Sequence, residues 1–180
     1  MEFDDVIVSR KSIRAYKSQK IDDELINYVL NCARLAPSWA NRQSWHFIVV
    51  KNKDIILRLS KTSLINRWLK DAPVIIVACG DPDRSGKNNG IPYFIVDVSI
   101  AMEHLVLAAA SKGLGTCWIA GFNEKKVKEI LEIPENIRVI ALTPLGYPLG
   151  KKKLFGEMVK IVIRSNKRKN IDEIVHLEKW

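Results

Sequence analysis

The sequence predicts an α/β or α+β fold in which helices and a sheet are layered around one long buried helix. Residues 94–110 are apolar on every face of a helix, so this helix should be covered on all sides. The run APVIIVAC at 72–79 is typical of a strand covered on both faces. Strands and helices alternate along the rest of the chain, which favours a layered arrangement of both.

The other elements follow from hydrophobic periodicity and from start and stop signals. A short amphipathic helix begins at Phe3 and runs into the polar segment 9–16. Further helices are predicted at 24–35, 54–60 and 124–131, and further strands at 46–51, 116–120 and 138–143. Gly113 permits the left-handed backbone that ends the central helix. Residues 144–148 form a turn-rich closing segment, and the apolar residues of 171–177 fit a terminal helix or an extended docking arm.

The central helix also bears on the oligomeric state. Asp97, Glu103 and His104 argue against a membrane span, which needs about 18 or more residues with few charges. In a chain of 180 residues, covering this helix on every side should take a second subunit as well as the chain's own elements. The sequence therefore predicts no membrane span and an interface at the helix.

Composition limits the class of protein and its partners. With 47% hydrophobic and 27% charged residues, the chain is typical of one soluble globular domain. A net charge of +9 favours an anionic partner, which could be nucleic acid, an acidic membrane surface or a phosphorylated small molecule. The acidic start of the chain lacks the features of a signal peptide, and the three cysteines lie far apart without disulfide or zinc spacing. These features predict a cytoplasmic protein with reduced thiols.

Two polar segments are candidates for ligand binding. Cations and hydroxyls crowd into residues 9–14, and arginine offers planar donors that match a phosphate group. The same pattern is also typical of a solvated helix end. In the segment 37–45, Asn41 and Gln43 carry both donors and acceptors, which suits the edge of a heterocycle. These side chains could equally satisfy the backbone of their own loop.

Several other sequence patterns do not indicate a nucleotide-binding or metal-binding site. Gly113 and Gly115 lack the third glycine and the preceding strand of a dinucleotide fingerprint, and Gly86 and Lys87 lack the rest of a P-loop. The three histidines have no metal-ligand spacing, so no metal site is predicted and they are interpreted as structural.

Five ordered segments together resemble one known family. They are Arg10-x-Ser12-x-Arg14, Ala36-Pro37-Ser38-x-x-Asn41-x-Gln43-x-Trp45, Gly113-x-Gly115-Thr116-Cys117-Trp118-Ile119-x-Gly121-Phe122, Leu145-Gly146-Tyr147-Pro148, and Arg168-Lys169 with Ile174-Val175-His176. In this order they span nearly the whole chain, and they resemble the FMN-dependent nitroreductase family.

The resemblance implies an α+β sandwich with a central mixed or antiparallel sheet flanked by helices. It also implies a homodimer built on the long central helix, with FMN at the dimer interface. Residues 1–180 would form a single nitroreductase-like domain. Residues 150–165 would be an inserted arm or lid, or a plain surface excursion, and residues 166–180 a C-terminal docking segment.

The resemblance also implies which residues bind the cofactor. The residues that correspond to those binding the phosphate and ribityl groups are Arg10, Lys11, Ser12 and Arg14. Of these, Arg14 would also lie close to the N1 and O2 edge of the flavin. Lys167 and Arg168 correspond to C-terminal cations that bind the same phosphate. Pro37, Ser38, Asn41 and Gln43 correspond to contacts with the isoalloxazine, which in the family are made partly from the opposite subunit. Ala120 and Gly121 correspond to the main chain beside flavin N5, and Asn66 to a further contact. The family commonly has proline where Ser44 stands, so a looser loop is expected here.

The function implied is an FMN-dependent oxidoreductase that uses NADH or NADPH. It would reduce nitroaromatics, quinones or related small acceptors by ping-pong hydride transfer through flavin N5. No catalytic side chain is assigned, and neither nucleic acid nor a membrane is an expected partner. One alternative is specialised flavin chemistry on the same fold, either reductive dehalogenation or flavin fragmentation. The other is a basic nucleic-acid-binding module, which is disfavoured because the cations are split between the chain ends and no binding motif is present.

Overall fold

A computed structural model of the chain describes residues 1–150 and 168–180. Residues Met1–Gly150 form one compact unit, and Lys151–Trp180 form a second. The predicted arm or lid lies outside the described residues apart from Gly150, and Lys167 lies outside them as well. In the second unit, the described residues contain one short 3-10 helix, η4 (Ile171–Glu173), in place of the longer terminal helix that the sequence allowed.

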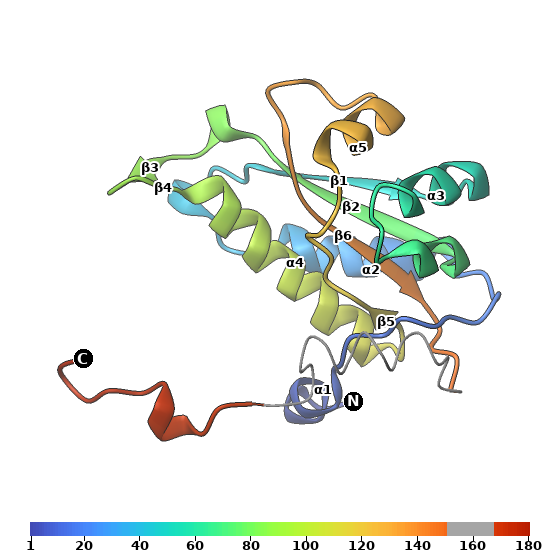
Figure 1. The fold of residues 1–180 in the computed structure, drawn as a ribbon. Coiled ribbons are helices and arrows are strands. Elements are labelled where there is room, and N and C mark those ends of the chain that lie inside the picture. The colour runs from blue at the N-terminus through green and yellow to red at the C-terminus, as the bar shows by residue number, and fades with distance from the viewer. Residues whose placement is uncertain (151–167) are drawn as a thin grey trace. The chain divides into compact units, whose positions relative to one another are not determined.

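The first unit is built on a four-stranded antiparallel sheet (Figure 1). Its strands, in spatial order, are β1 (Trp45–Val50), β2 (Val74–Gly80), β6 (Arg138–Gly146) and β5 (Gly115–Thr116). Every residue of β2 is buried, as its continuous apolar run predicts for a central strand. A separate two-stranded hairpin pairs β3 (Lys87–Asn88) with β4 (Ile91–Pro92).

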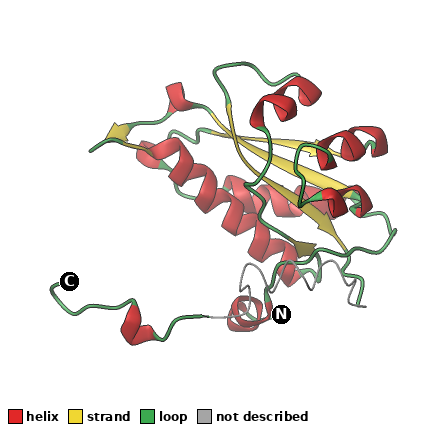
Figure 2. Ribbon diagram, in the orientation of Figure 1, coloured by secondary structure: helices red, strands yellow, loops and turns green. Residues whose placement is uncertain are grey.

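Helices cover both faces of this sheet (Figure 2). The α-helices are α1 (Phe3–Ser9), α2 (Asp23–Arg34), α3 (Lys53–Ser60), α4 (Tyr93–Ser111) and α5 (Glu124–Leu131), and the first unit also has the 3-10 helices η1 (Trp39–Asn41), η2 (Arg67–Asp71) and η3 (Pro82–Arg84). Successive side chains of a strand point to opposite faces. Accordingly Ile76 of β2 joins a core with α2 and α4, whereas Ile75 and Val77 join a second core with α3, η2 and α5. The predicted α+β layered sandwich is confirmed.

The central helix α4 contributes most of its length to the first core. Val98, Met102 and Leu105 are fully buried there. By length and composition alone, α4 could also cross a membrane, but its burial is that of a core helix. Ile95 and Val96 remain exposed on its other side. A single chain therefore covers the helix only in part.

Three predicted elements differ from the observed ones. The first helix ends at Ser9, and the residues after it are extended. The strand β5 stops at Thr116, where the next N–H, that of Cys117, donates to the Thr143 side chain of β6 at 3.3 Å instead of to a main-chain oxygen. The predicted strand 116–120 is resumed only at Ile119, which forms an antiparallel bridge with Leu142. In contrast, β6 continues through Pro144 to Gly146. Pro144 has no N–H to donate, and it lies just beyond the residues of β6 that pair with β5.

Candidate functional site

The extended segment after α1 lies along the short strand β5. Ile13 N donates to Thr116 O at 2.8 Å, and Ser12 forms a parallel bridge with Thr116. Gly115 allows this close approach, since a Cβ atom there would lie 2.7 Å from the Ile13 side chain. This backbone pairing therefore fixes the position of the segment that carries the side chains of Arg10, Ser12 and Arg14.

These polar side chains gather near the buried thiol of Cys117. Burial raises the pKa of Cys117, while the charge of Arg14, a hydrogen bond with Ser12 and the charge of Arg10 oppose that shift. Arg10 also lies close enough to Glu103 of α4 to oppose the rise that burial causes in the pKa of that carboxyl group. Lys11, by contrast, is exposed. The sequence-predicted Arg10, Ser12 and Arg14 thus belong to one cluster.

One donor of this cluster has no hydrogen-bond partner within the described part of the chain. Arg14 Nη1 is buried and makes no hydrogen bond with any described residue. Buried polar groups are nearly always hydrogen-bonded, and an unpaired buried charge is costly. A guanidinium group in this state is suited to a ligand that brings an acceptor or a negative charge.

The loop of residues 37–44 has an unusual backbone. Ala40, Asn41 and Gln43 all have positive φ, at 49°, 54° and 50°, a conformation that costs on the order of 1 kcal/mol or more for each non-glycine residue. Ser38 Oγ accepts from Gln43 N at 2.9 Å and so closes the loop. Strained backbone of this kind persists only where its surroundings determine it, and it is concentrated at functional sites.

The polar side chains of this loop contact one another. Gln43 Nε2 donates to Asn41 Oδ1 at 3.2 Å, and both residues are exposed, as is Pro37. Ser44, where a looser loop was expected, is fully buried, and its hydroxyl donates to Asp97 Oδ2 at 2.9 Å. Asp97 and Ser44 were not predicted as site residues, and the signal for Asp97 was an acidic residue within an otherwise apolar helix.

A third group joins Asn66 to the main chain of Gly121. Asn66 is buried, and its Nδ2 donates to Gly121 O at 3.2 Å and to Ser63 Oγ at 3.1 Å. The neighbouring Ala120 and Gly121 are exposed, and their N–H groups donate to no described residue. Two main-chain donors are therefore available to a ligand at this point.

The predicted site residues Lys167 and Arg168 belong to the second unit. Arg168 is exposed in the second unit, and Lys167 lies outside the described residues. Among residues 1–150 and 168–180, no three His, Cys, Asp or Glu side chains are grouped so as to hold a metal ion.

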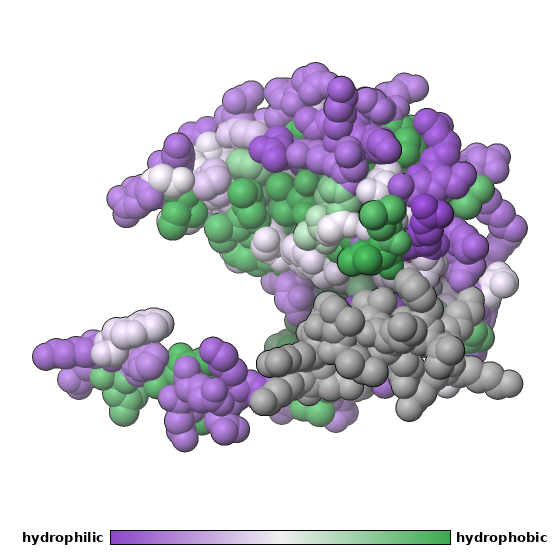
Figure 3. Space-filling view, in the orientation of Figure 1, coloured by the Kyte–Doolittle hydropathy of each residue, from purple (hydrophilic) through white to green (hydrophobic). Residues whose placement is uncertain are grey.

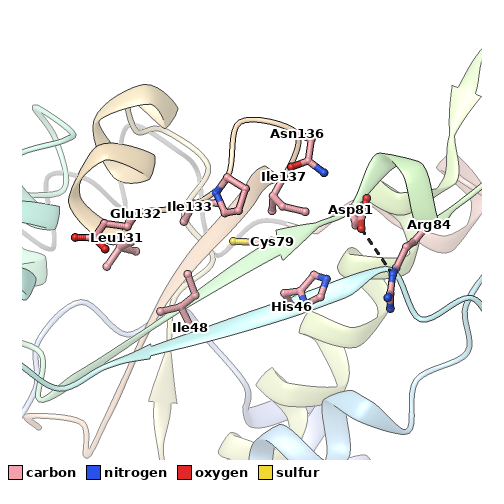
Figure 4. Close-up of a pocket in the computed structure, with 11 residues that line it drawn as sticks. His46, Ile48, Cys79, Asp81, Arg84, Leu131, Glu132, Ile133, Asn136 and Ile137 are labelled. Atoms are coloured by element: carbon pink, nitrogen blue, oxygen red, sulfur yellow. Dashed lines mark ion pairs between the residues drawn. The ribbon is translucent and has the colours of Figure 1, made fainter.

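A pocket of about 420 Å³ lies elsewhere, between β1, β2 and the segment 131–137 (Figure 4). Burial raises the pKa of the Cys79 thiol at its wall to about 12. Arg84, a cation that lines the pocket, is paired with Asp81, and its Nε lies 3.8 Å from Asp81 Oδ2. The pocket includes none of the predicted site residues and offers no unpaired cation to a phosphate group.

The fold is an α+β sandwich, and the predicted site residues of its first unit form three groups. They are the cluster of Arg10, Ser12 and Arg14 near Cys117, the strained loop 37–44 beside α4, and the Ala120–Gly121 segment that Asn66 contacts. The model of the nitroreductase family matches residues 7–65 and 57–147. The chain belongs to the nitroreductase family, as the ordered segments of its sequence predicted.

Similar proteins agree with this placement. A putative NADH dehydrogenase/NAD(P)H nitroreductase of Archaeoglobus fulgidus is 37% identical over 97% of each chain. An iodotyrosine deiodinase of Thermotoga neapolitana is 25% identical over 90% of this chain and 96% of its own length.

Solved structures agree as well. A nitroreductase family protein of Clostridium novyi is 42% identical with a TM-score of 0.81, over 87% of this chain and 91% of its own. An FMN-dependent nitroreductase of Clostridium difficile is 28% identical with a TM-score of 0.79, over 97% of this chain and 98% of its own.

Proposed function

We propose that this chain is an FMN-dependent oxidoreductase that takes electrons from NADH or NADPH and reduces nitroaromatics, quinones or related small acceptors. The observation that carries the proposal is the buried Arg14 Nη1 without a partner among the described residues. When bound, FMN supplies the redox chemistry, because its N5 accepts a hydride from the nicotinamide and the electrons then pass to the second substrate. Family membership and the FMN-dependent relative support the same cofactor.

The cluster of Arg10, Ser12 and Arg14 would hold the phosphate end and part of the cofactor's polar edge. Guanidinium groups pair with phosphate through two parallel hydrogen bonds, and a serine hydroxyl adds a short donor. Lys11, Lys167 and Arg168 are proposed as further cations for the same group. Charge-assisted hydrogen bonds contribute about 1.5–3 kcal/mol each. Arg14 should dominate because its Nη1 atom is buried without a hydrogen-bond partner among the described residues.

The loop and the Gly121 segment would hold the ring system. Pro37, Ser38, Asn41 and Gln43 lie in or beside backbone whose left-handed turns are already formed, so little ordering is needed on binding. Ala120 and Gly121 would offer their N–H groups, and Asn66 would keep this segment in place through the Gly121 carbonyl.

A homodimer is proposed from the apolar surface that one chain leaves open. Ile95 and Val96 of α4 are exposed, as is Ile91 just before it, and Figure 3 shows hydrophobic side chains gathered over this side of α4. Phe3 and Val8 of α1, a helix that contacts α4, are exposed too. Fully burying one such side chain contributes about 1.5–3 kcal/mol, so pairing two copies through this surface would stabilise both.

The cellular setting is also a proposal. Cys32, Cys79 and Cys117 are all free thiols, which suits the reducing cytoplasm.

An anaerobic absorbance experiment tests the function. Purified protein, or apoprotein to which FMN has been added, should show flavin bands that bleach when NADH or NADPH is added. Reoxidation by a quinone or a nitroaromatic compound should then restore the bands and complete a ping-pong cycle. A colourless protein that takes up no FMN would overturn the proposal, and salt-dependent binding to DNA would be measured next.

Reductive dehalogenation is a second candidate, favoured by one observation. A relative that matches 90% of this chain is named iodotyrosine deiodinase. Reoxidation of the reduced protein by iodotyrosine with release of iodide, faster than by quinones, would select this activity instead.

A further inference from the structure

Asp97 of α4 collects hydrogen bonds from two loops. It is 1% exposed, so its carboxylate lies in the apolar core. Oδ1 accepts from Trp39 N at 2.7 Å, and Oδ2 accepts from Ser44 Oγ and from Ser85 Oγ, both at 2.9 Å. A carboxylate is costly to bury unless its oxygens are hydrogen-bonded. The three hydrogen bonds therefore stabilise the buried carboxylate, and they fix the positions of the three residues that donate them.

Two of these donors stand at the two ends of the strained loop. Trp39 comes just before the left-handed residues Ala40 and Asn41, and Ser44 comes just after Gln43. Ser44 O also accepts from Asp81 N at 2.8 Å. One side chain in the rigid central helix thus fixes where the loop begins and where it ends.

The Trp39 side chain packs against the segment that carries the third donor, Ser85. A Cβ atom on Gly86 would lie 2.4 Å from the Trp39 ring, so the ring rests directly on this glycine. The Tyr93 ring lies 6.3 Å from the Trp39 ring, and Arg42 Cζ lies 5.7 Å from its centroid. These contacts restrain the Trp39 side chain, while Asp97 restrains its main chain.

We infer that Asp97 is a positioning residue that holds residues 38–43 in their binding conformation before any ligand arrives, with the Ser44 hydroxyl as its tie to the far end of the loop. This inference rests on the proposed function, since the ligand of the loop is FMN. The hydrogen bond from the Ser44 hydroxyl to Asp97 restrains the far end of the loop. Backbone with positive φ at Ala40 and Gln43 persists because both ends are fixed.

The test compares Ser44→Ala with Ser60→Ala in the full-length apoprotein. Both serines are buried, and each hydroxyl makes one hydrogen bond, to Asp97 Oδ2 at 2.9 Å and to Leu57 O at 2.8 Å. Ser60 lies in α3, outside the proposed site. FMN affinity is measured by absorbance titration, and hydrogen exchange is measured for the amides of residues 38–44 without FMN.

Ser44→Ala should weaken FMN binding at least about fivefold and speed the exchange of the loop amides, including that of Trp39. An effect of this size corresponds to losing one hydrogen bond of about 1 kcal/mol. Asp97→Asn should act in the same direction and more strongly, because an amide group presents one acceptor oxygen instead of two. Ser60→Ala should leave both the affinity and the loop exchange within twofold of wild type.

Two results would overturn the inference. One is wild-type affinity and wild-type loop exchange in Ser44→Ala. The other is an equal loss in Ser60→Ala, which would mean that any buried hydroxyl matters as much. Failure of the proposed function is distinguishable, because the wild-type apoprotein would then bind no FMN, while faster exchange in Ser44→Ala would still demonstrate the tie to Asp97.

Discussion

The side-chain amide of Asn66 donates a hydrogen bond to the main-chain oxygen of Gly121 at 3.2 Å. The two residues lie 55 positions apart in the sequence, and Asn66 is buried whereas Gly121 is exposed. The bond therefore runs from the interior of the fold to a surface segment whose own N–H groups donate to no described residue. Under the proposed function, Asn66 would act on FMN through this segment.

Asn66→Ala should weaken FMN binding by disordering residues 120–121. Because a buried donor is removed and the Gly121 carbonyl can turn to water, the loss of stability should be modest, about 1 kcal/mol. Stability is measured by urea denaturation and affinity by FMN titration of the apoprotein. Asn52→Ala is the matched control, since it removes the cap of α3 and should cost a similar 0.5–2 kcal/mol. Equal FMN affinity in the two variants would exclude the proposed role of Asn66.

Arg14→Ala should lower FMN affinity about tenfold or more. It removes a guanidinium group whose buried Nη1 has no hydrogen-bond partner among the described residues, and charge-assisted bonds from such a group contribute about 1.5–3 kcal/mol each. Arg14→Lys should recover part of the loss, since the charge remains but the planar pair of donors does not. The measurements are FMN titration of the apoprotein and the midpoint potential of the bound flavin. Arg58→Ala, in the exposed part of α3, is the control. Unchanged affinity and potential in Arg14→Ala would refute the assignment.

The regular part of the fold could be predicted because its signals are local. The helix α5 was predicted at its observed bounds, since Asn123 caps it and its Oδ1 accepts from Lys126 N. The apolar run of β2 and the left-handed Gly113 after α4 were equally plain. The end of β5 was not predictable, because the Thr143 hydroxyl that accepts from the next N–H, that of Cys117, lies 26 residues further along the chain.

The site could be predicted only as separate pieces. The resemblance selected Arg14, Asn66 and Gly121, yet it did not show that the Asn66 side chain donates to the main-chain oxygen of Gly121. Asp97 was missed as a site residue because its role depends on three donors that are 58, 53 and 12 positions away. A buried carboxylate is recognised as functional only when its partners are known.

Ile95→Glu should prevent the proposed dimer, because two charges would face an apolar interface without partners. Ile95 and Leu57 are both 41% exposed in the single chain, which makes Leu57→Glu in α3 the matched control. Sedimentation velocity should show a monomer for Ile95→Glu and a dimer for both the wild type and Leu57→Glu. A dimer that survives in Ile95→Glu would place the interface elsewhere.

The pair of Glu124 and Arg138 should make stability depend on pH in the acid range. Arg138 Nε and Nη2 donate to the Glu124 carboxylate at 2.9 and 3.0 Å, and Val139 N donates to it at 2.9 Å. The hydrogen bond from Arg138 lowers the pKa of Glu124, although burial partly opposes the shift. A carboxyl group whose pKa is lower in the folded state adds stability above its unfolded pKa, and this contribution disappears as the pH falls through the folded pKa.

Glu124→Gln should therefore lose less stability than the wild type as the pH falls from about 5 to about 3. Because the pair is partly exposed, the difference should stay near or below about 1 kcal/mol. Thermal unfolding followed by circular dichroism across this range measures it, and high salt should reduce it. Asp23→Asn, which breaks the more exposed pair with Lys51, is the comparison variant. Parallel slopes for the wild type and Glu124→Gln would mean that Glu124 has the same pKa in the folded and unfolded chain.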